Sequence, residues 1–285
     1  MEIEVKGHSG CNIEIVNNGK DLFINKSTNN IEYAPRLLKQ AKKQQEASKT
    51  TYQHIRIPEI MEISQSDNGL NVKMEYIYSK NFIDYFEDAG FDQIEYFVKA
   101  LKIFINSEIA ESYLKEIEKQ CLIDKFLDVT QKVAQNEHIN TDYDVCEILR
   151  KSANVFQELD NTIQIPIGIC HGDLTFSNIL FNGNNYYLID FLDSFIETPL
   201  MDLVKIRQDS CYAWSLLMYR KKIDGVRMAI ISKKIDLEID NYYKQYEWYR
   251  KYYQTFQLMN FLRILQYAKE PQIIKYLKDT LKSML

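Results

Sequence analysis

The sequence predicts an α+β protein made of two lobes: a small antiparallel sheet with one inserted helix, then a larger and mainly helical body. Apolar and polar residues alternate in the opening third, in short runs separated by glycine-bearing turns. From about residue 80, helical periodicity dominates. The 285 residues are enough to give each lobe a core. We expect the lobes to span residues 1–76 and 77–285.

The first lobe contains five runs that favour strands and one that favours a helix. Pro35 stands near the first turn of the helical run "APRLLKQAKKQQEASKT", a position where proline is well tolerated. The turn "QSDNG" separates the last two strand-like runs. In chain order, the strand-like runs are EIEVKG, NIEIVNN, KDLFINKS, IPEIMEIS and LNVKMEYI.

Helical patterns make up most of the second lobe. Within it, "NILF" and "YYLID" flank the turn "NGNN", a strong hairpin signal. The helical patterns cover residues 82–89, 91–108, 110–135, 143–159, 201–219 and 237–266.

Composition excludes several classes of protein. Apolar residues make up 46% of the chain, but their runs are short and interrupted by charge, so we expect no membrane span. The first twenty residues lack the apolar stretch of a signal peptide. Five cysteines without CxxC spacing argue against a disulfide framework and a zinc site, and for a cytoplasmic protein.

Charge is distributed unevenly along the chain. Residues 221–285 carry 13 Lys and Arg against 7 Asp and Glu, whereas residues 1–220 carry 22 against 33. A basic tail is usually a solvated helix face, and no aromatic-basic strand motif accompanies it. We therefore expect no nucleic-acid partner.

The segment "CHGDLTFSNILFNGNNYYLIDF", residues 170–191, concentrates polar groups around the hairpin. A turn centred on Gly183–Asn184 places Asn178 opposite Ile189 or Asp190, whereas a centre on Asn182–Gly183 places it opposite Tyr187. The first register, which we favour, brings together an amide and a carboxylate oxygen. These are the hard ligands that suit Mg²⁺ bound partly by substrate phosphates.

Two further side chains precede the hairpin. Asp173 is placed to accept a proton from a hydroxyl group, and His171 is expected to hold the loop through a buried hydrogen bond. The alternative for the whole segment is a polar turn whose Asp and Asn cap backbone groups. The D-x-x-x-x-N spacing, followed by a strand that ends in Asp, favours a functional site over a purely structural turn.

HGDLTFSNILF followed by LIDFLDS resembles the catalytic and metal-binding loops of the aminoglycoside phosphotransferase and choline kinase superfamily. These are small-molecule kinases with a two-lobed protein-kinase-like fold. The resemblance implies that Asp173 is the catalytic base and that Asn178 and Asp190 bind the metal. Asp193 stands where some relatives carry a further acid. "TPLMDLVKI" is similar to the family's P-x-x-D-L segment, which implies that Asp202 braces the catalytic loop.

In the first lobe, "VKGHSGCNIEIV" resembles the glycine-bearing turn over the ATP phosphates, which implies nucleotide contacts at Gly7, Ser9 and Gly10. Lys26 matches the lysine that pairs with the phosphates. Glu46, the one acid in "RLLKQAKKQQEASK", would be its ion-pair partner. The backbone from Glu75 to Ile77 would bind adenine.

The resemblance implies transfer of the γ-phosphate of ATP, with Mg²⁺, to a hydroxyl of a small molecule. Leu192 replaces the glycine of the protein-kinase DFG motif, and only eight residues separate Asp190 from Pro199. So short a segment leaves little room for a peptide-docking platform.

We expect a sugar or an amino alcohol such as choline or ethanolamine as the acceptor. An aminoglycoside-type antibiotic kinase and a catalytically silent nucleotide-binding module are the alternatives. The choice between ATP and GTP and the oligomeric state stay open. So does the role of the C-terminal aromatics, which either line the acceptor pocket or form core; they include Trp214, Tyr242, Trp248 and Tyr252.

Overall fold

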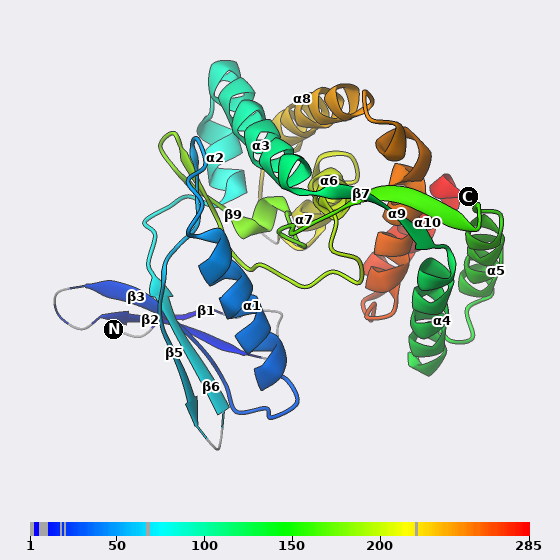
Figure 1. Ribbon diagram of the computed structural model, residues 1–285, viewed down its shortest axis with the longest axis horizontal. Helices are drawn as coiled ribbons and strands as arrows, with labels where there is room; N and C mark the ends of the chain where they lie inside the picture. Colours follow the sequence, from blue (N-terminus) through cyan, green and yellow to red (C-terminus); the bar gives the residue numbers. More distant parts are fainter. Residues whose placement is uncertain (1–2, 6–10, 18, 20, 67–68, 220–221) are drawn as a thin grey trace. The chain divides into compact units, whose positions relative to one another are not determined.

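The computed structural model describes residues 3–5, 11–17, 19, 21–66, 69–219 and 222–285 (Figure 1). The contacts within the chain define two compact units. The first unit takes Met1–Ser107, His171–Asp193 and Ile223–Ile231, and the second takes the rest. Sheet and helix content confirm the α+β class. The lobe boundary between residues 76 and 77 stays a prediction.

The first unit contains a five-stranded antiparallel sheet with helix α1 (Ala34–Ala47) packed on it (Figure 1). In the last strand of this sheet by sequence, residues 70, 72 and 74 are buried and those between them are half-buried. This alternation turns one face of the sheet toward Leu37 and Ala41 of α1. The strands, in spatial order, are β1 (Ile3–Val5), β2 (Asn12–Asn17), β3 (Leu22–Thr28), β6 (Gly69–Glu75) and β5 (Ile60–Ser66).

A second sheet of the same unit joins distant parts of the chain. Strands β9 (Ile179–Asn182) and β10 (Asn185–Leu188) form a hairpin, and β4 (Ile55–Arg56) pairs in parallel with β10. An aromatic cluster packs this hairpin against α2 (Phe82–Asp88) and α3 (Phe91–Glu111). Its rings belong to Phe82, Tyr85, Phe86, Phe97, Phe176, Phe181 and Tyr186.

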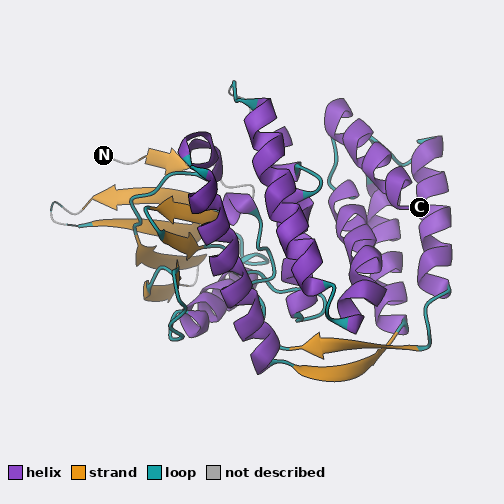
Figure 2. Ribbon diagram, turned by 90° about the horizontal axis from the view of Figure 1, so that it is seen from above, coloured by secondary structure: helices purple, strands orange, loops and turns teal. Residues whose placement is uncertain are grey.

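The second unit is mainly helical. Its longest wholly contained helix, α9 (Glu247–Leu265), packs against several others and has a largely buried surface. A two-stranded ribbon, β7 (Tyr113–Glu118) with β8 (Thr162–Ile167), crosses one end of these helices (Figure 2). The helices are α4 (Gln120–Gln135), α5 (Tyr143–Gln157), α6 (Pro199–Ser210), α7 (Trp214–Leu217), α9 (Glu247–Leu265), α10 (Pro271–Met284) and most of α8 (Gly225–Tyr243).

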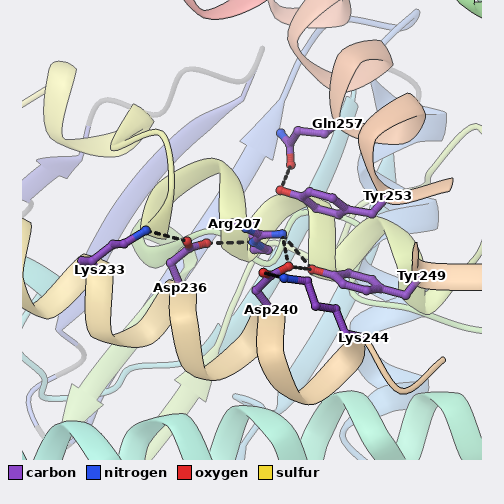
Figure 3. A network of polar contacts seen from close by, with 8 residues as sticks. All are labelled: Arg207, Lys233, Asp236, Asp240, Lys244, Tyr249, Tyr253 and Gln257. Carbon is purple, nitrogen blue, oxygen red and sulfur yellow. Dashed lines mark hydrogen bonds and ion pairs between the residues drawn. The ribbon is translucent and has the colours of Figure 1, made fainter. Parts of the chain in front are cut away.

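A buried arginine joins three of these helices (Figure 3). Arg207 of α6 donates to Asp236 at 2.8 Å and to Asp240 at 2.7 Å, both on α8, and its guanidinium lies 4.3 Å from the ring centroid of Tyr253 on α9. Tyr249 of α9 accepts a further hydrogen bond of 2.8 Å from Arg207. Two carboxylates and aromatic contacts thus compensate the desolvation of the guanidinium.

Three helical expectations are wrong in part. Residues 113–118, expected within a helix at 110–135, form strand β7 because they pair with β8, a strand the sequence patterns did not reveal. The pair begins where Ser112 meets Gly168 so closely that a Cβ at residue 168 would lie 2.8 Å from the Ser112 Cβ.

Two expected helices are each divided in the structure. Residues 237–266 are two helices, since α8 starts at Gly225 and ends at Tyr243. The pattern at 201–219 is likewise two helices, and α10 was not predicted.

The C-terminal aromatics differ in burial. Trp248 and Tyr252 are buried in the helical core, whereas Tyr242 is 36% exposed and Trp214 is half-buried. Across the described part of the chain, none of the helices combines the length and apolarity that crossing a bilayer requires.

Candidate functional site

The loop that contains Asp173 closes on itself. After Gly172, which has a φ of +86°, the chain makes a short turn at Phe176–Asn178. The turn brings the Asn178 amide nitrogen to 2.9 Å from both the backbone oxygen and the Oδ2 atom of Asp173. The five-residue spacing between Asp173 and Asn178 therefore joins a carboxylate and an amide in one hydrogen-bonded pair.

The hairpin has the register that the sequence favoured. Its loop is Gly183–Asn184, because Asn182 pairs with Asn185 and Ile179 pairs with Leu188. One step beyond the strands, the Ile189 N–H donates to the Asn178 carbonyl at 3.1 Å. Asn178 therefore lies opposite Ile189, next to Asp190.

His171 connects the two loops. Its ring is fully buried and lies 4.2 Å, centroid to centroid, from the Phe191 ring. Nε2 donates to the Ile189 carbonyl at 2.9 Å, and Nδ1 accepts from the Asp173 N–H at 3.2 Å. Burial lowers the pKa of His171 to about 4, so the ring is neutral near pH 7. The neutral ring holds the loop of Asp173 against the loop of Asp190.

Lys26 approaches this site from the central strand β3. Its side chain is almost fully buried and forms an ion pair with the Asp190 carboxylate. Asp190 has a φ of +64°, a left-handed conformation that costs a residue with a Cβ roughly 1–2 kcal/mol. A lysine and a carboxylate that are distant in the sequence thus meet at the end of the hairpin.

The expected pair between Lys26 and Glu46 is replaced by other contacts. Glu46 lies near the C-terminal end of α1, is exposed, and pairs with Lys49 at 2.5 Å. Its position beyond the buried face of the helix keeps it in solvent. Lys26 has Asp190 as its partner instead.

Helix α1 reaches the site through two lysines that the sequence analysis did not single out. Lys43 Nζ donates to the Leu192 carbonyl at 2.6 Å, and Lys39 Nζ lies 2.7 Å from Asp193 Oδ2. Lys39 and Lys43 are four residues apart and therefore project from the same side of the helix. That spacing was visible in the sequence, but it did not identify their partners.

The remaining expected nucleotide contacts fall partly near the end of β6 and partly on residues that the structure does not describe. The Glu75 N–H donates to the Glu59 carbonyl at 2.9 Å, so this donor is already used within the protein. Ile77 is buried and lies two residues after the end of β6. The predicted phosphate contacts Gly7, Ser9 and Gly10 fall outside the described residues.

Asp202 lies in the first turn of α6 and is fully buried in the second unit. Thr198 caps the same turn by accepting from the Leu200 N–H at 3.2 Å. The bracing role of Asp202 toward the loop of Asp173 stays a prediction.

The donor set fits Mg²⁺ held jointly with a ligand. Because the Asn178 nitrogen donates to Asp173, its amide oxygen is the atom that would bind a metal ion, and the Asp190 carboxylate would supply a second hard oxygen. Among the described residues, no group of three or more His, Cys, Asp or Glu side chains could hold a metal ion alone. Magnesium commonly relies on one or two protein oxygens and takes the rest from phosphates and water.

Comparison with known proteins agrees with this geometry. Residues 122–226 match the model of the phosphotransferase enzyme family. This segment contains the loops of Asp173 and Asp190. Among curated proteins, none matches the chain in sequence.

Solved structures of small-molecule kinases share the fold over the whole chain. The GDP complex of aminoglycoside 2′-phosphotransferase-IIIa is 15% identical, with a TM-score of 0.63, and the match covers 100% of this chain and 92% of that one. Glucosamine kinase with glucosamine, ADP and phosphate is 11% identical, with a TM-score of 0.62 and coverage of 100% and 76%.

A choline/ethanolamine kinase family protein from Mesorhizobium loti is 12% identical, with a TM-score of 0.60 and coverage of 100% and 87%. The fold and the matched segment together confirm the resemblance seen in the sequence. The protein has the protein-kinase-like fold of the aminoglycoside phosphotransferase and choline kinase superfamily, and its sequence matches the phosphotransferase family over residues 122–226.

Proposed function

We propose that this protein transfers the γ-phosphate of ATP to a hydroxyl group of a sugar or amino alcohol, with Mg²⁺ as cofactor. The observation that carries the proposal is the arrangement around His171. The Asp173–Asn178 pair lies on one side of this neutral ring, and the Lys26–Asp190 pair meets the loop on the other. A proton acceptor, two hard oxygen ligands and a buried cation are the groups that phosphoryl transfer needs.

Each residue has a role in the proposed step. Asp173 accepts the proton of the acceptor hydroxyl while the hydroxyl oxygen bonds to the γ-phosphorus. The bond from that phosphorus to the β–γ bridging oxygen breaks, and the nucleoside diphosphate leaves. Lys26 neutralises phosphate charge, and the oxygens of Asn178 and Asp190 would hold Mg²⁺. When bound, the metal would supply further neutralisation of phosphate charge.

The acceptor class is supported by the similar structures. Glucosamine kinase, with glucosamine bound, and the choline/ethanolamine kinase family protein share this fold. Glucosamine, choline and ethanolamine are small alcohols that carry nitrogen. An aminoglycoside phosphotransferase shares the fold as well, so the fold does not rank these acceptors. We place sugars, amino sugars and amino alcohols ahead of aminoglycoside antibiotics because the C-terminal segment, with 13 Lys and Arg against 7 Asp and Glu over residues 221–285, is a poor match for a polycation.

The test is Mg²⁺-dependent release of ADP from ATP in the presence of separate pools of sugars and amino sugars, choline and ethanolamine, nucleosides, and aminoglycosides. We expect one of the first two pools to stimulate release, and Asp173→Asn to lower the stimulated rate about 10²–10⁴-fold, the usual contribution of a positioned base. Calorimetry with Mg²⁺–ADP on the same variant should show nearly unchanged nucleotide binding.

Other outcomes separate the alternatives. Stimulation by aminoglycosides alone identifies an antibiotic kinase. Nucleotide binding without turnover in any pool favours a silent binding module. Absence of Mg²⁺–ADP binding to the unmodified protein contradicts the proposal as a whole.

A further inference from the structure

The loop from Ile189 to Asp193 is held from two sides. His171 accepts the Leu192 N–H at 2.9 Å through its own carbonyl, and its ring donates to the Ile189 carbonyl. On the other side, α1 supplies Lys43 to the Leu192 carbonyl and Lys39 to Asp193. The loop is thus clamped between the buried histidine and the helix.

The clamp matters because the loop it holds contains Asp190. This residue combines a left-handed backbone with an ion pair to Lys26, so the direction of its carboxylate depends on a conformation that most residues avoid. Such a conformation persists only where the surroundings enforce it. Lys43 donates to the carbonyl of Leu192, which lies two residues after Asp190. This hydrogen bond fixes the backbone that follows Asp190 and so helps to keep Asp190 in its left-handed conformation.

The contacts of Lys39 and Lys43 differ in burial and therefore in strength. The Lys39 side chain is 70% exposed, so its ion pair with Asp193 is weak in water. Lys43 is half-buried, and its charge lies near enough to His171 to contribute to lowering the pKa of the ring. A charge-assisted hydrogen bond in that setting is the stronger of the two.

We propose that Lys43 is a positioning residue for Asp190: by holding the Leu192 carbonyl, it fixes the loop whose carboxylate receives the metal ion. Helix α1 thereby acts on the site through a lysine and a backbone carbonyl, while Lys26 of β3 contacts Asp190 directly. This inference rests on the proposed function, because it assigns a purpose to the orientation of Asp190.

The test uses Lys43→Met, the rescue variant Lys43→Arg, and Lys42→Met as a matched control on the same helix. Lys42 is exposed, so the control removes the same charge from α1 without touching the loop. Calorimetry measures ADP affinity with and without Mg²⁺, and hydrogen exchange measures protection of the amides from Asp190 to Asp193 in the ligand-free protein.

In the unmodified protein, Mg²⁺ should raise ADP affinity. We expect Lys43→Met to reduce that increase about tenfold, in line with the loss of one charge-assisted hydrogen bond, and to leave affinity for ADP without Mg²⁺ nearly unchanged. The loop amides should exchange faster in Lys43→Met. Lys43→Arg should restore both properties, because a guanidinium can donate to the same carbonyl.

The inference is overturned if Lys43→Met matches Lys42→Met in both the Mg²⁺ response and the exchange of the loop. Equal loss of ADP affinity with and without Mg²⁺ also contradicts it, since Lys43 would then bind nucleotide directly or support the fold. If the unmodified protein binds no Mg²⁺–ADP, the proposed function fails first and this inference fails with it.

Discussion

The buried ring of His171 makes the stability of the fold depend on pH. The ring is held neutral, with a pKa of about 4 against about 6.5 for an ordinary histidine, and burial is the main cause. In the unfolded chain the same ring takes up a proton as the pH falls below 6.5, whereas the folded protein does not. Stability is therefore full above pH 6.5 and declines as the pH falls toward 4.

The size of the effect follows from the two pKa values. A gap of about 2.5 between them corresponds to a total loss of about 3 kcal/mol in the free energy of unfolding. About 2 kcal/mol of this is lost by pH 5, where the unfolded ring is almost fully protonated and the folded ring is not.

The assay is urea unfolding at pH 7.5 and pH 5 for the unmodified protein, His171→Gln and His138→Gln. Glutamine keeps a donor for the Ile189 carbonyl but does not titrate, so His171→Gln should lose about 2 kcal/mol less than the unmodified protein over this interval. His138 is exposed, and its substitution controls for the removal of a histidine. A His171 ring that titrates above pH 6 by NMR, or an equal loss in both variants, would refute the reasoning.

Three other outcomes are expected. Lys26→Met should weaken Mg²⁺–ADP binding about 10–100-fold in calorimetry, because it removes a charged hydrogen-bond donor from the site; an unchanged affinity would place the phosphates elsewhere. Arg207→Met should lower the free energy of unfolding by about 3–5 kcal/mol, since it removes the close cationic partner of the buried Asp236, whereas exposed Lys244→Met should cost less than about 1 kcal/mol; similar values would contradict the burial argument. Gly172→Ala should cost roughly 1–2 kcal/mol in the same unfolding assay because its φ is +86°, and a neutral effect would show that the loop relaxes.

The sequence predicted the parts of this fold that local patterns determine. Alternation identified the strands of the main sheet, and the turn "NGNN" set the register that places Asn178 opposite Ile189. The spacing of Asp173 and Asn178 lies within one loop, so the chain itself brings the two side chains together. Such local information needs no knowledge of the rest of the molecule.

The features that sequence reasoning missed depend on distant partners. Residues 113–118 read equally well as helix, and only their pairing with β8 makes them a strand. The partner of Lys26 was placed on α1 because Glu46 was the one acid there, but Glu46 is exposed near the end of the helix and pairs with Lys49, whereas Lys26 pairs with Asp190. Lys43 was overlooked because its partner is a backbone carbonyl, which leaves no trace in the pattern of side chains.

Strand β4 has a consequence for the order in which the protein forms during synthesis. Ile55 pairs with Tyr186, so an early segment of the chain waits for a partner more than a hundred residues downstream. Until that partner leaves the ribosome, Phe86 and Phe97 lack the rings of Phe181 and Tyr186 that cover them in the finished protein. Long-range closure of this kind is slow and exposes apolar surface while it lasts. Lys26 and Asp190 therefore meet only after the chain has been made through residue 190, and until then a nascent chain exposes apolar surface of the kind that promotes aggregation.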